Sequence, residues 1–158
     1  MKRDFKPKVN TTAADISFTA IQFLVLLLFI VSPNFYTLNL PDFLFWCGIV
    51  IALLGFILFF VAVLTLGKSL SLYPTPSPKS ELIIHGIYKY IRHPIYTGLL
   101  FFLLGLSIVL AGISKFILFV IALILFSKKA DYEEKRLVLK FKNYEKYKAK
   151  TGKFLPKI

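Results

Sequence analysis

Residues 43–66 read FLFWCGIVIALLGFILFFVAVLTL, an apolar run of 24 residues that contains no charged side chain. As an α-helix this run would rise about 36 Å, at about 1.5 Å per residue. The hydrocarbon core of a bilayer is about 30 Å thick, so a helix of this length can cross it with some tilt. The stretch therefore predicts a transmembrane helix.

The rest of the chain has the composition of a membrane protein. Of its 158 residues, 57% are hydrophobic and 17 are phenylalanine. Three more apolar runs lie at about residues 16–31, 95–111 and 113–130. The last run reaches bilayer length only if Lys115 near its start and the lysines at its end extend toward the membrane surfaces. We predict an all-α integral membrane protein with about four transmembrane helices, formed as a single membrane domain over residues 1–158.

The formal charge is +12, and the positions of the basic residues predict the topology. Four Lys and Arg precede the first run, four lie in the loop 67–94, eleven follow residue 126, and only Lys115 lies elsewhere. Cytoplasmic segments of membrane proteins hold the excess of Lys and Arg. We therefore expect both termini, the loop 67–94 and the tail 131–158 to be cytoplasmic. Because long apolar runs interrupt the basic segments, a nucleic-acid-binding domain and a disordered basic chain are excluded.

The two cytoplasmic segments differ in kind. Three prolines between residues 74 and 78 predict that the first half of the loop is extended. The tail lacks Gly and Pro from Ser127 to about Lys150, and it should form an amphipathic helix. One alternative for such a basic helix is a non-catalytic scaffold that binds anionic lipid. The single cysteine, Cys47, predicts neither a disulfide nor a cysteine metal site, and no metal site is expected.

The junction between the loop and the third run gathers polar residues at the expected membrane surface. Residues 86–98 read GIYKYIRHPIYTG. Pro94 suits the first turn of a helix, with His93 as the flanking residue, and the free N–H groups of that turn suit a carboxylate or a phosphate. Tyr96 would lie one turn inside the span, and Gly98 would let another backbone or a ligand approach closely. The alternative is that the tyrosines and the arginine of this stretch form an interfacial anchor belt.

A second polar cluster, Asp131-Tyr-Glu-Glu134, follows the fourth run directly. The turn between the third and fourth runs is short, which predicts an antiparallel hairpin. Such a hairpin would bring residues 93–98 beside residues 128–134, so that the two clusters form one site at the cytoplasmic face. The alternative is pairing within the helix, as between Asp131 and Lys135, which is worth only a few tenths of a kcal/mol per pair.

Several stretches carry a resemblance to a known family. They are LGKSLS at 66–71, PTP at 74–76, ELIIHGIY at 81–88 and RHPIYTG at 92–98, followed by EExxLxxxF at 133–141 and TGKFLP at 151–156. In this order they resemble the isoprenylcysteine carboxyl methyltransferase and phospholipid methyltransferase superfamily. The resemblance covers about residues 66–156.

This resemblance implies S-adenosyl-L-methionine as the methyl donor, held between the two polar clusters. By position, the cofactor-binding residues would be Ser80, Glu81, Leu82, Ile83, Tyr88, His93, Pro94, Ile95, Tyr96, Glu133 and Glu134. The substrate-binding residues would include Arg92 and Lys129, the latter standing where the eukaryotic members that methylate prenylcysteine have Arg. No residue is assigned a catalytic role.

The function implied is that of an integral membrane methyltransferase with its active site at the cytoplasmic face. It would transfer a methyl group to a carboxylate, thiol or amine of a small lipophilic or amphiphilic acceptor that enters from the bilayer. Within enzymes, a phospholipid-type N-methyltransferase is the alternative. Apart from this substrate, the partner expected is the lipid bilayer itself.

The topology can be tested by cysteine accessibility in a variant that lacks Cys47. We expect cysteines at Lys79 and Lys150 to react with a membrane-impermeant maleimide from the cytoplasmic side, and a cysteine at Asn39 to react from the opposite side, because 19 of the 20 Lys and Arg fall in the segments assigned to the cytoplasm. Labelling of the cysteine at Asn39 from the cytoplasmic side alone would contradict the four-span topology.

Overall fold

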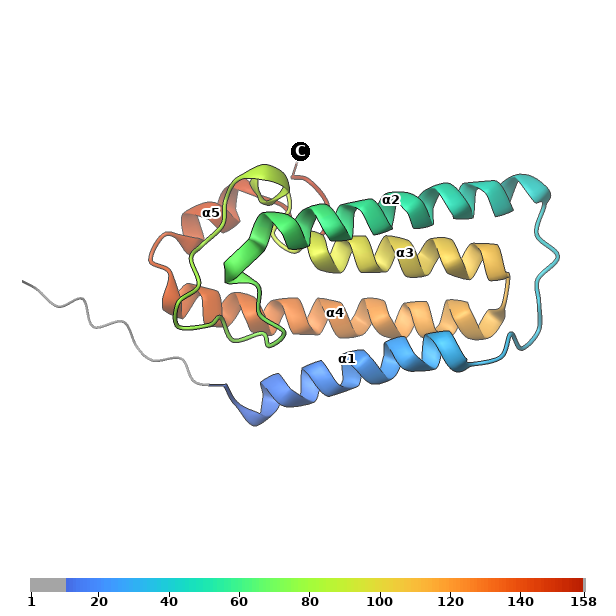
Figure 1. Cartoon of the computed structure of the whole chain (residues 1–158), viewed down its shortest axis with the longest axis horizontal. Helices are drawn as coiled ribbons and strands as arrows, with labels where there is room; N and C mark the ends of the chain where they lie inside the picture. Colours follow the sequence, from blue (N-terminus) through green and yellow to red (C-terminus); the bar gives the residue numbers. More distant parts are fainter. Residues whose placement is uncertain (1–10, 158) are drawn as a thin grey trace, which may run out of the picture.

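The computed structural model describes residues 11–157, and its regular elements are helices (Figure 1). The long helices are α1 (Ala13–Val31), α2 (Asp42–Leu66), α3 (Pro94–Leu110) and α4 (Ile113–Lys140), and the short ones are η1 (Gly67–Ser69), η2 (Gly86–Lys89) and α5 (Tyr144–Lys150). The predicted all-helical class is confirmed. The basic residues before position 11, on which part of the topology argument depends, lie outside the described residues.

Apolar side chains cover the outside of the long helices. Ile30 on α1 and Leu64 on α2 are each 77% exposed, and Trp46 is 65% exposed. Large apolar side chains exposed in such numbers mark a surface that contacts lipid rather than water. By length and composition, α1 and α2 are able to cross a membrane, whereas α3 has 17 residues and is shorter. The count of four spans stays a prediction.

The helices pack in the order α2, α3, α4, α1 (Figure 1). The contact between α2 and α3 is the closest of these, because glycines stand where the two backbones cross. A Cβ atom added at Gly55 would lie 2.7 Å from the carbonyl oxygen of Gly98, and one added at Gly48 would lie 2.9 Å from that of Gly105. Small residues allow this approach in membrane helices. The expectation for Gly98 is confirmed, with the backbone of α2 as the approaching group.

A buried lysine joins the C-terminal end of α1 to the first turn of α4. The Lys115 ammonium donates to the carbonyl oxygens of Phe29 and Ser32, both at 2.6 Å, and the side chain is only 3% exposed. The carbonyls at the end of a helix lack intrahelical partners and attract cations. Our expectation that Lys115 extends outward toward the membrane surface is therefore wrong, because the end of α1 offers it a closer set of oxygens.

The predicted tail helix from Ser127 to about Lys150 is interrupted. The chain remains helical to the end of α4 and leaves the helical conformation at Phe141, and α5 begins at Tyr144. Both aromatic side chains line a cavity at this end of the bundle. Their packing overrides the favourable helix propensity of the sequence, which is a weak preference that tertiary contacts commonly outweigh.

Residues 70–85 contain no helix or strand and cross the α5 end of the bundle (Figure 1). We call residues 70–85 the strap. The prolines predict that the first half of the loop is extended rather than helical, and the strap indeed contains no helix, but it bends at residues 72–75 and turns at residues 78–79 and so is not extended throughout. The strap, η2, α5 and the chain end after α5 together surround the start of α3, and this is where the polar residues gather.

The close contact between α2 and α3 predicts a strong effect of a single methyl group. Gly55→Ala should lower the thermal unfolding midpoint in detergent, because overpacking a tight contact typically costs about 1–3 kcal/mol. Leu54→Ala, at a neighbouring position that is 62% exposed, is the control and should change the midpoint little. Equal midpoints for Gly55→Ala and the unmodified protein would contradict the packing described.

Candidate functional site

The start of α3 is built as the sequence predicts. His93 is the N-cap residue and Pro94 occupies the first helical position. The chain end after α5 lies beside it: the amide of His93 donates to the carbonyl of Lys153 at 3.1 Å, and the Thr97 hydroxyl donates to the carbonyl of Phe154 at 2.8 Å. The C-terminal segment therefore fixes the turn that carries the first polar cluster.

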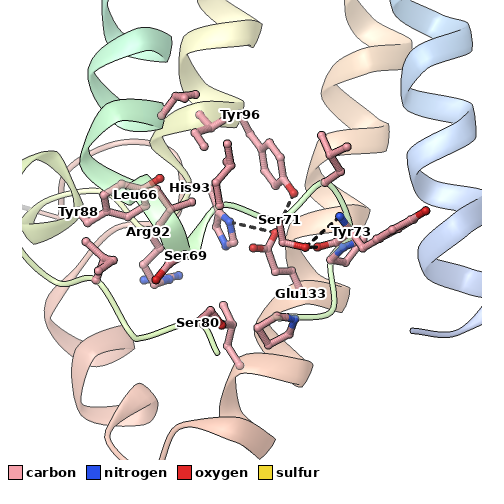
Figure 2. A pocket seen from close by; sticks show the side chains of 18 of the residues that line it. Leu66, Ser69, Ser71, Tyr73, Ser80, Tyr88, Arg92, His93, Tyr96 and Glu133 are labelled. Carbon is pink, nitrogen blue, oxygen red and sulfur yellow. Dashed lines mark hydrogen bonds and ion pairs between the residues drawn. The ribbon is translucent and has the colours of Figure 1, made fainter. Parts of the chain in front are cut away.

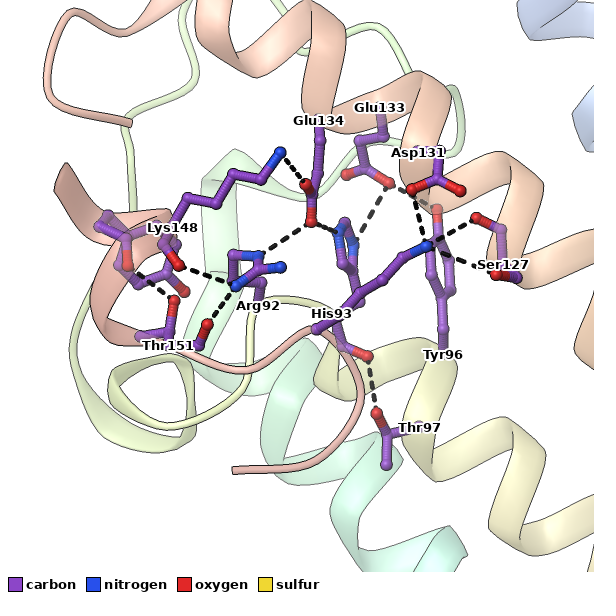
Figure 3. Close-up of polar contacts among 12 residues, drawn as sticks. Arg92, His93, Tyr96, Thr97, Ser127, Asp131, Glu133, Glu134, Lys148 and Thr151 are labelled. Carbon is purple, nitrogen blue, oxygen red and sulfur yellow. Dashed lines mark hydrogen bonds and ion pairs between the residues drawn. The ribbon is translucent and has the colours of Figure 1, made fainter. Parts of the chain in front are cut away.

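The two polar clusters meet, as the hairpin predicts. The Tyr96 hydroxyl on α3 donates to Glu133 Oε2 on α4 at 2.7 Å, and His93 Nε2 lies 3.2 Å from Glu134 Oε1 (Figure 3). The His93 ring also stacks on the Tyr96 ring, with centroids 5.5 Å apart. The two glutamates thus contact groups on α3, and the alternative that they only pair with bases on their own helix does not describe the contacts.

Glu134 lies at the centre of a buried charge cluster (Figure 3). Its carboxylate lies 2.9 Å from Nε of Arg92 and 2.9 Å from Nζ of Lys148, and its side chain is 5% exposed. Burial alone would raise the pKa of Glu134, but the hydrogen bonds from His93, Lys148 and Arg92 outweigh it and hold that pKa well below its usual range. Glu134 is therefore ionised at neutral pH, and it ties α4 to the start of α3 and to α5.

Arg92 completes this cluster from the other side. Its guanidinium donates to Glu134 and to the carbonyl oxygens of Lys148 and Thr151 near the end of α5. These contacts use a planar donor group to join three segments. They favour a structural role for Arg92, whereas its predicted contact with substrate stays a prediction.

Beside the charge cluster lies a cavity of about 380 Å³ (Figure 2). Of the predicted site residues, those that line it are Ser80, Glu81, Leu82, Ile83, Tyr88, Arg92, His93, Ile95, Tyr96 and Glu133. Pro94, Lys129 and Glu134 lie outside the lining. The cavity therefore unites the strap, the start of α3 and the end of α4, which are far apart in sequence.

Sequence reasoning missed the walls contributed by α1 and α2. Gln22, Phe23 and Leu26 line the cavity from α1, and Phe59, Val63 and Leu66 line it from α2. For α2 the sequence offers no signal, because these residues resemble their lipid-facing neighbours. For α1 a signal existed: Gln22 is a polar residue inside an apolar run, and such residues commonly face a protein interior or a cavity.

The α5 side of the cavity is aromatic. Tyr144 and Tyr147 line it together with Tyr88, and the Tyr147 hydroxyl donates to the carbonyl of Tyr88 at 2.6 Å. Burial raises the pKa of Tyr147 to about 12, although Arg92 opposes the shift, and burial also raises the pKa values of Tyr88 and Tyr144. These phenols therefore stay protonated at neutral pH. Within residues 11–157, the buried Tyr144 hydroxyl has no hydrogen-bond partner.

Lys129 lies behind the α1 wall of the cavity. Its side chain is buried, its ammonium donates to Oε1 of Gln22, and it lies 5.5 Å from the centre of the Tyr96 ring. The cation is therefore held next to the point where Tyr96 and Glu133 meet. Because Gln22 itself lines the cavity, the charge lies one side chain away from the cavity space.

The chain is similar in sequence to known methyltransferases. The sequence profile of the isoprenylcysteine carboxyl methyltransferase family matches residues 48–139, which include the start of α3 and both glutamates of α4. The "Probable protein-S-isoprenylcysteine O-methyltransferase" of Oryza sativa subsp. japonica is 32% identical over 120 residues, covering 73% of this chain and 63% of that protein. The protein-S-isoprenylcysteine O-methyltransferase of Tribolium castaneum is 29% identical over 115 residues, covering 70% of this chain and 41% of that protein.

The fold agrees with a solved structure. The eukaryotic intramembrane Ras methyltransferase, an isoprenylcysteine carboxyl methyltransferase, superposes with a TM-score of 0.68 at 23% identity, over 94% of this chain and 54% of that chain. This chain spans 63% or less of the length of the curated relatives named above. Since the family profile covers more than half of the sequence, the chain belongs to the isoprenylcysteine carboxyl methyltransferase family of integral membrane proteins.

Proposed function

We propose that this protein is a membrane methyltransferase that uses S-adenosyl-L-methionine and methylates the carboxylate of a lipophilic acceptor. The observation that carries the proposal is the cavity itself. Its wall contains the start of α3 and the end of α4, which both lie within the residues that the family profile matches, and it continues along apolar side chains of α1 and α2. A polar donor and an apolar acceptor can therefore reach one space.

The residues present fit the donor. Its ammonium or ribose hydroxyls suit Glu133, whose carboxylate is held in the cavity wall by the Tyr96 hydroxyl. The aromatic rings of Tyr88, Tyr144 and Tyr147 suit its adenine and its cationic sulfonium. A volume of about 380 Å³ is within the range of about 300–1,000 Å³ common for small-molecule sites. The Tyr144 hydroxyl, which has no hydrogen-bond partner within the described residues, is a buried polar group that a ligand could satisfy.

When bound, the donor supplies an electrophilic methyl group on a sulfonium. The protein's own contribution is to exclude water and to place charges. Apolar side chains of α1, α2 and α3, among them Leu26, Phe59 and Leu99, line the cavity next to Tyr96. Reaction of a carboxylate with a sulfonium cancels charge, and a dry cavity favours this change over bulk water. A carboxylate is already ionised at neutral pH, so no general base is required.

The charge on Lys129 supports an anionic acceptor. Its ammonium is buried behind Gln22 and close to Tyr96, so it favours a carboxylate in the adjoining part of the cavity and disfavours the ammonium of an aminophospholipid. The curated relatives named above are protein-S-isoprenylcysteine O-methyltransferases. We therefore propose an isoprenylcysteine-type carboxylate as the acceptor class. The alternatives to this proposal are phospholipid N-methylation and a non-catalytic protein that binds anionic lipid.

Donor binding should depend on Glu133. In purified protein, S-adenosylhomocysteine should raise the thermal unfolding midpoint, and Glu133→Gln should weaken its affinity by about 10- to 150-fold, since a hydrogen bond to a charged group contributes about 1.5–3 kcal/mol. Isothermal titration measures this directly. Glu145→Gln, an exposed position on α5, is the matched control. If the Glu133 variant bound with unchanged affinity, Glu133 would not contact the donor.

The acceptor class can be tested with labelled donor and three acceptors. We expect transfer to N-acetyl-S-farnesylcysteine, none to its carboxamide, and none to phosphatidylethanolamine, because the cation at Lys129 favours a carboxylate. Lys129→Met should raise the acceptor KM, while Lys128→Met, at the exposed neighbouring position, should not. Label on the lipid amine would favour N-methylation, and no transfer to any acceptor despite donor binding would exclude the carboxylate class tested.

A further inference from the structure

A carboxylate outside the cavity holds two of its walls together. Asp15, in the first turn of α1, is fully buried. Its Oδ2 accepts the backbone N–H of Thr12 at 2.7 Å, which is half of an ordinary capping box. Helix caps usually stay in contact with water, whereas this carboxylate is enclosed by protein. A buried carboxylate is costly unless hydrogen bonds satisfy it, so the remaining contacts of Asp15 matter.

Those contacts come from the strap, 60 residues away in sequence. Oδ1 of Asp15 accepts the backbone N–H of Thr75 at 2.8 Å, and Oδ2 accepts the Thr75 hydroxyl at 2.9 Å. Thr75 stands between Pro74 and Pro76, and proline has no N–H. The amide of Thr75 is therefore the one backbone donor of these three residues, and it is directed at Asp15.

Other hydrogen bonds also attach the strap to the helices, among them one from the backbone N–H of Glu81 to the Ser69 hydroxyl of η1. The Thr19 hydroxyl on α1 donates to the carbonyl of Leu72, and the Lys140 ammonium on α4 contacts Ser77 and Ser80. Without a helix or strand of its own, the strap depends on such ties for its shape. Of these contacts, those at Asp15 place two hydrogen bonds from the strap on a buried carboxylate.

The same two segments both supply parts of the cavity wall. Pro74 and Pro76 line it on either side of Thr75, and the strap continues into the lining residues 80–83. From α1, Gln22 and Phe23 line it two turns after Asp15. The contacts between Asp15 and Thr75 therefore join two segments that line the cavity.

We propose that Asp15 is a positioning residue, which acts through Thr75 to lock the strap against α1 and so shapes the donor end of the cavity. The proposal rests on the proposed function, because it assumes that the donor occupies the space beside the strap. If Asp15 only capped α1, its contacts to Thr12 would be sufficient. Its additional contacts to Thr75 indicate a second role, which is to hold the strap.

The decisive variant is Thr75→Val, which removes the hydroxyl bond and leaves the cap of α1 intact. We expect it to weaken the affinity for S-adenosylhomocysteine about tenfold, and Asp15→Ala to weaken it more. In turnover with N-acetyl-S-farnesylcysteine, the donor KM should rise for both variants while kcat at saturating donor stays unchanged, since the positioned strap contributes binding and not chemistry. The double variant should be no worse than Asp15→Ala, because the two residues act as one unit.

Two controls separate this role from helix capping. Thr12→Ala weakens the cap and should lower the thermal midpoint without changing donor affinity, and Asp42→Ala, at the exposed first turn of α2, should change neither. Unchanged donor affinity in both Thr75→Val and Asp15→Ala would overturn the inference. Failure of the unmodified protein to bind S-adenosylhomocysteine would instead overturn the proposed function. If Asp15→Ala does not fold, Thr75→Val alone decides.

Discussion

The structure depends on how two adjacent carboxylates, the buried Glu134 and the partly exposed Glu133, are hydrogen-bonded at the point where α4 leaves the apolar part of the bundle. Glu134 is surrounded by donors from α3 and α5, and Glu133 by the Tyr96 hydroxyl and the His93 ring. A carboxylate in such surroundings is stable only when hydrogen bonds replace its water. The need to satisfy both acids therefore fixes how α3, α4 and the chain end come together, and the cavity forms beside them.

The two glutamates differ in their contacts and in their position relative to the cavity. The carboxylate oxygens of Glu134 contact Arg92, His93 and Lys148, and these contacts explain its lowered pKa. Glu134 also lies outside the cavity lining, which favours a structural role. Glu133 lines the cavity, and its side chain is 26% exposed. One glutamate thus keeps the other in position. The sequence motif shows two equivalent glutamates, and only their surroundings distinguish them.

Much of this arrangement follows from the sequence. The apolar runs predict α1, α2 and α3 to within a few residues, whereas α4 continues ten residues past the run at 113–130. The short turn between α3 and α4 predicts that His93 and Glu134 meet. These features are local, or they depend on one hairpin. The break at Phe141 was not predictable in this way, because it comes from the insertion of aromatic rings into a cavity that the sequence alone does not reveal.

The α1 wall was missed for a related reason. Gln22 and Asp15 are single polar residues in or beside an apolar run, and their partners, Lys129 and Thr75, are 107 and 60 residues away. No periodicity connects such pairs. Their polarity at membrane depth was the signal available, and it indicates that a residue has a partner without identifying it.

Direct photolabelling tests the central claim, that the strap and the two polar clusters form one donor site. The purified protein in detergent is irradiated with tritiated S-adenosyl-L-methionine, with and without excess S-adenosylhomocysteine, and the labelled peptides are mapped. The account predicts competed label in peptides from residues 70–96 and 133–147, where aromatic residues line the cavity. Competed label at the opposite end of the bundle, near the turn between α3 and α4, or no competed label at all, would contradict it.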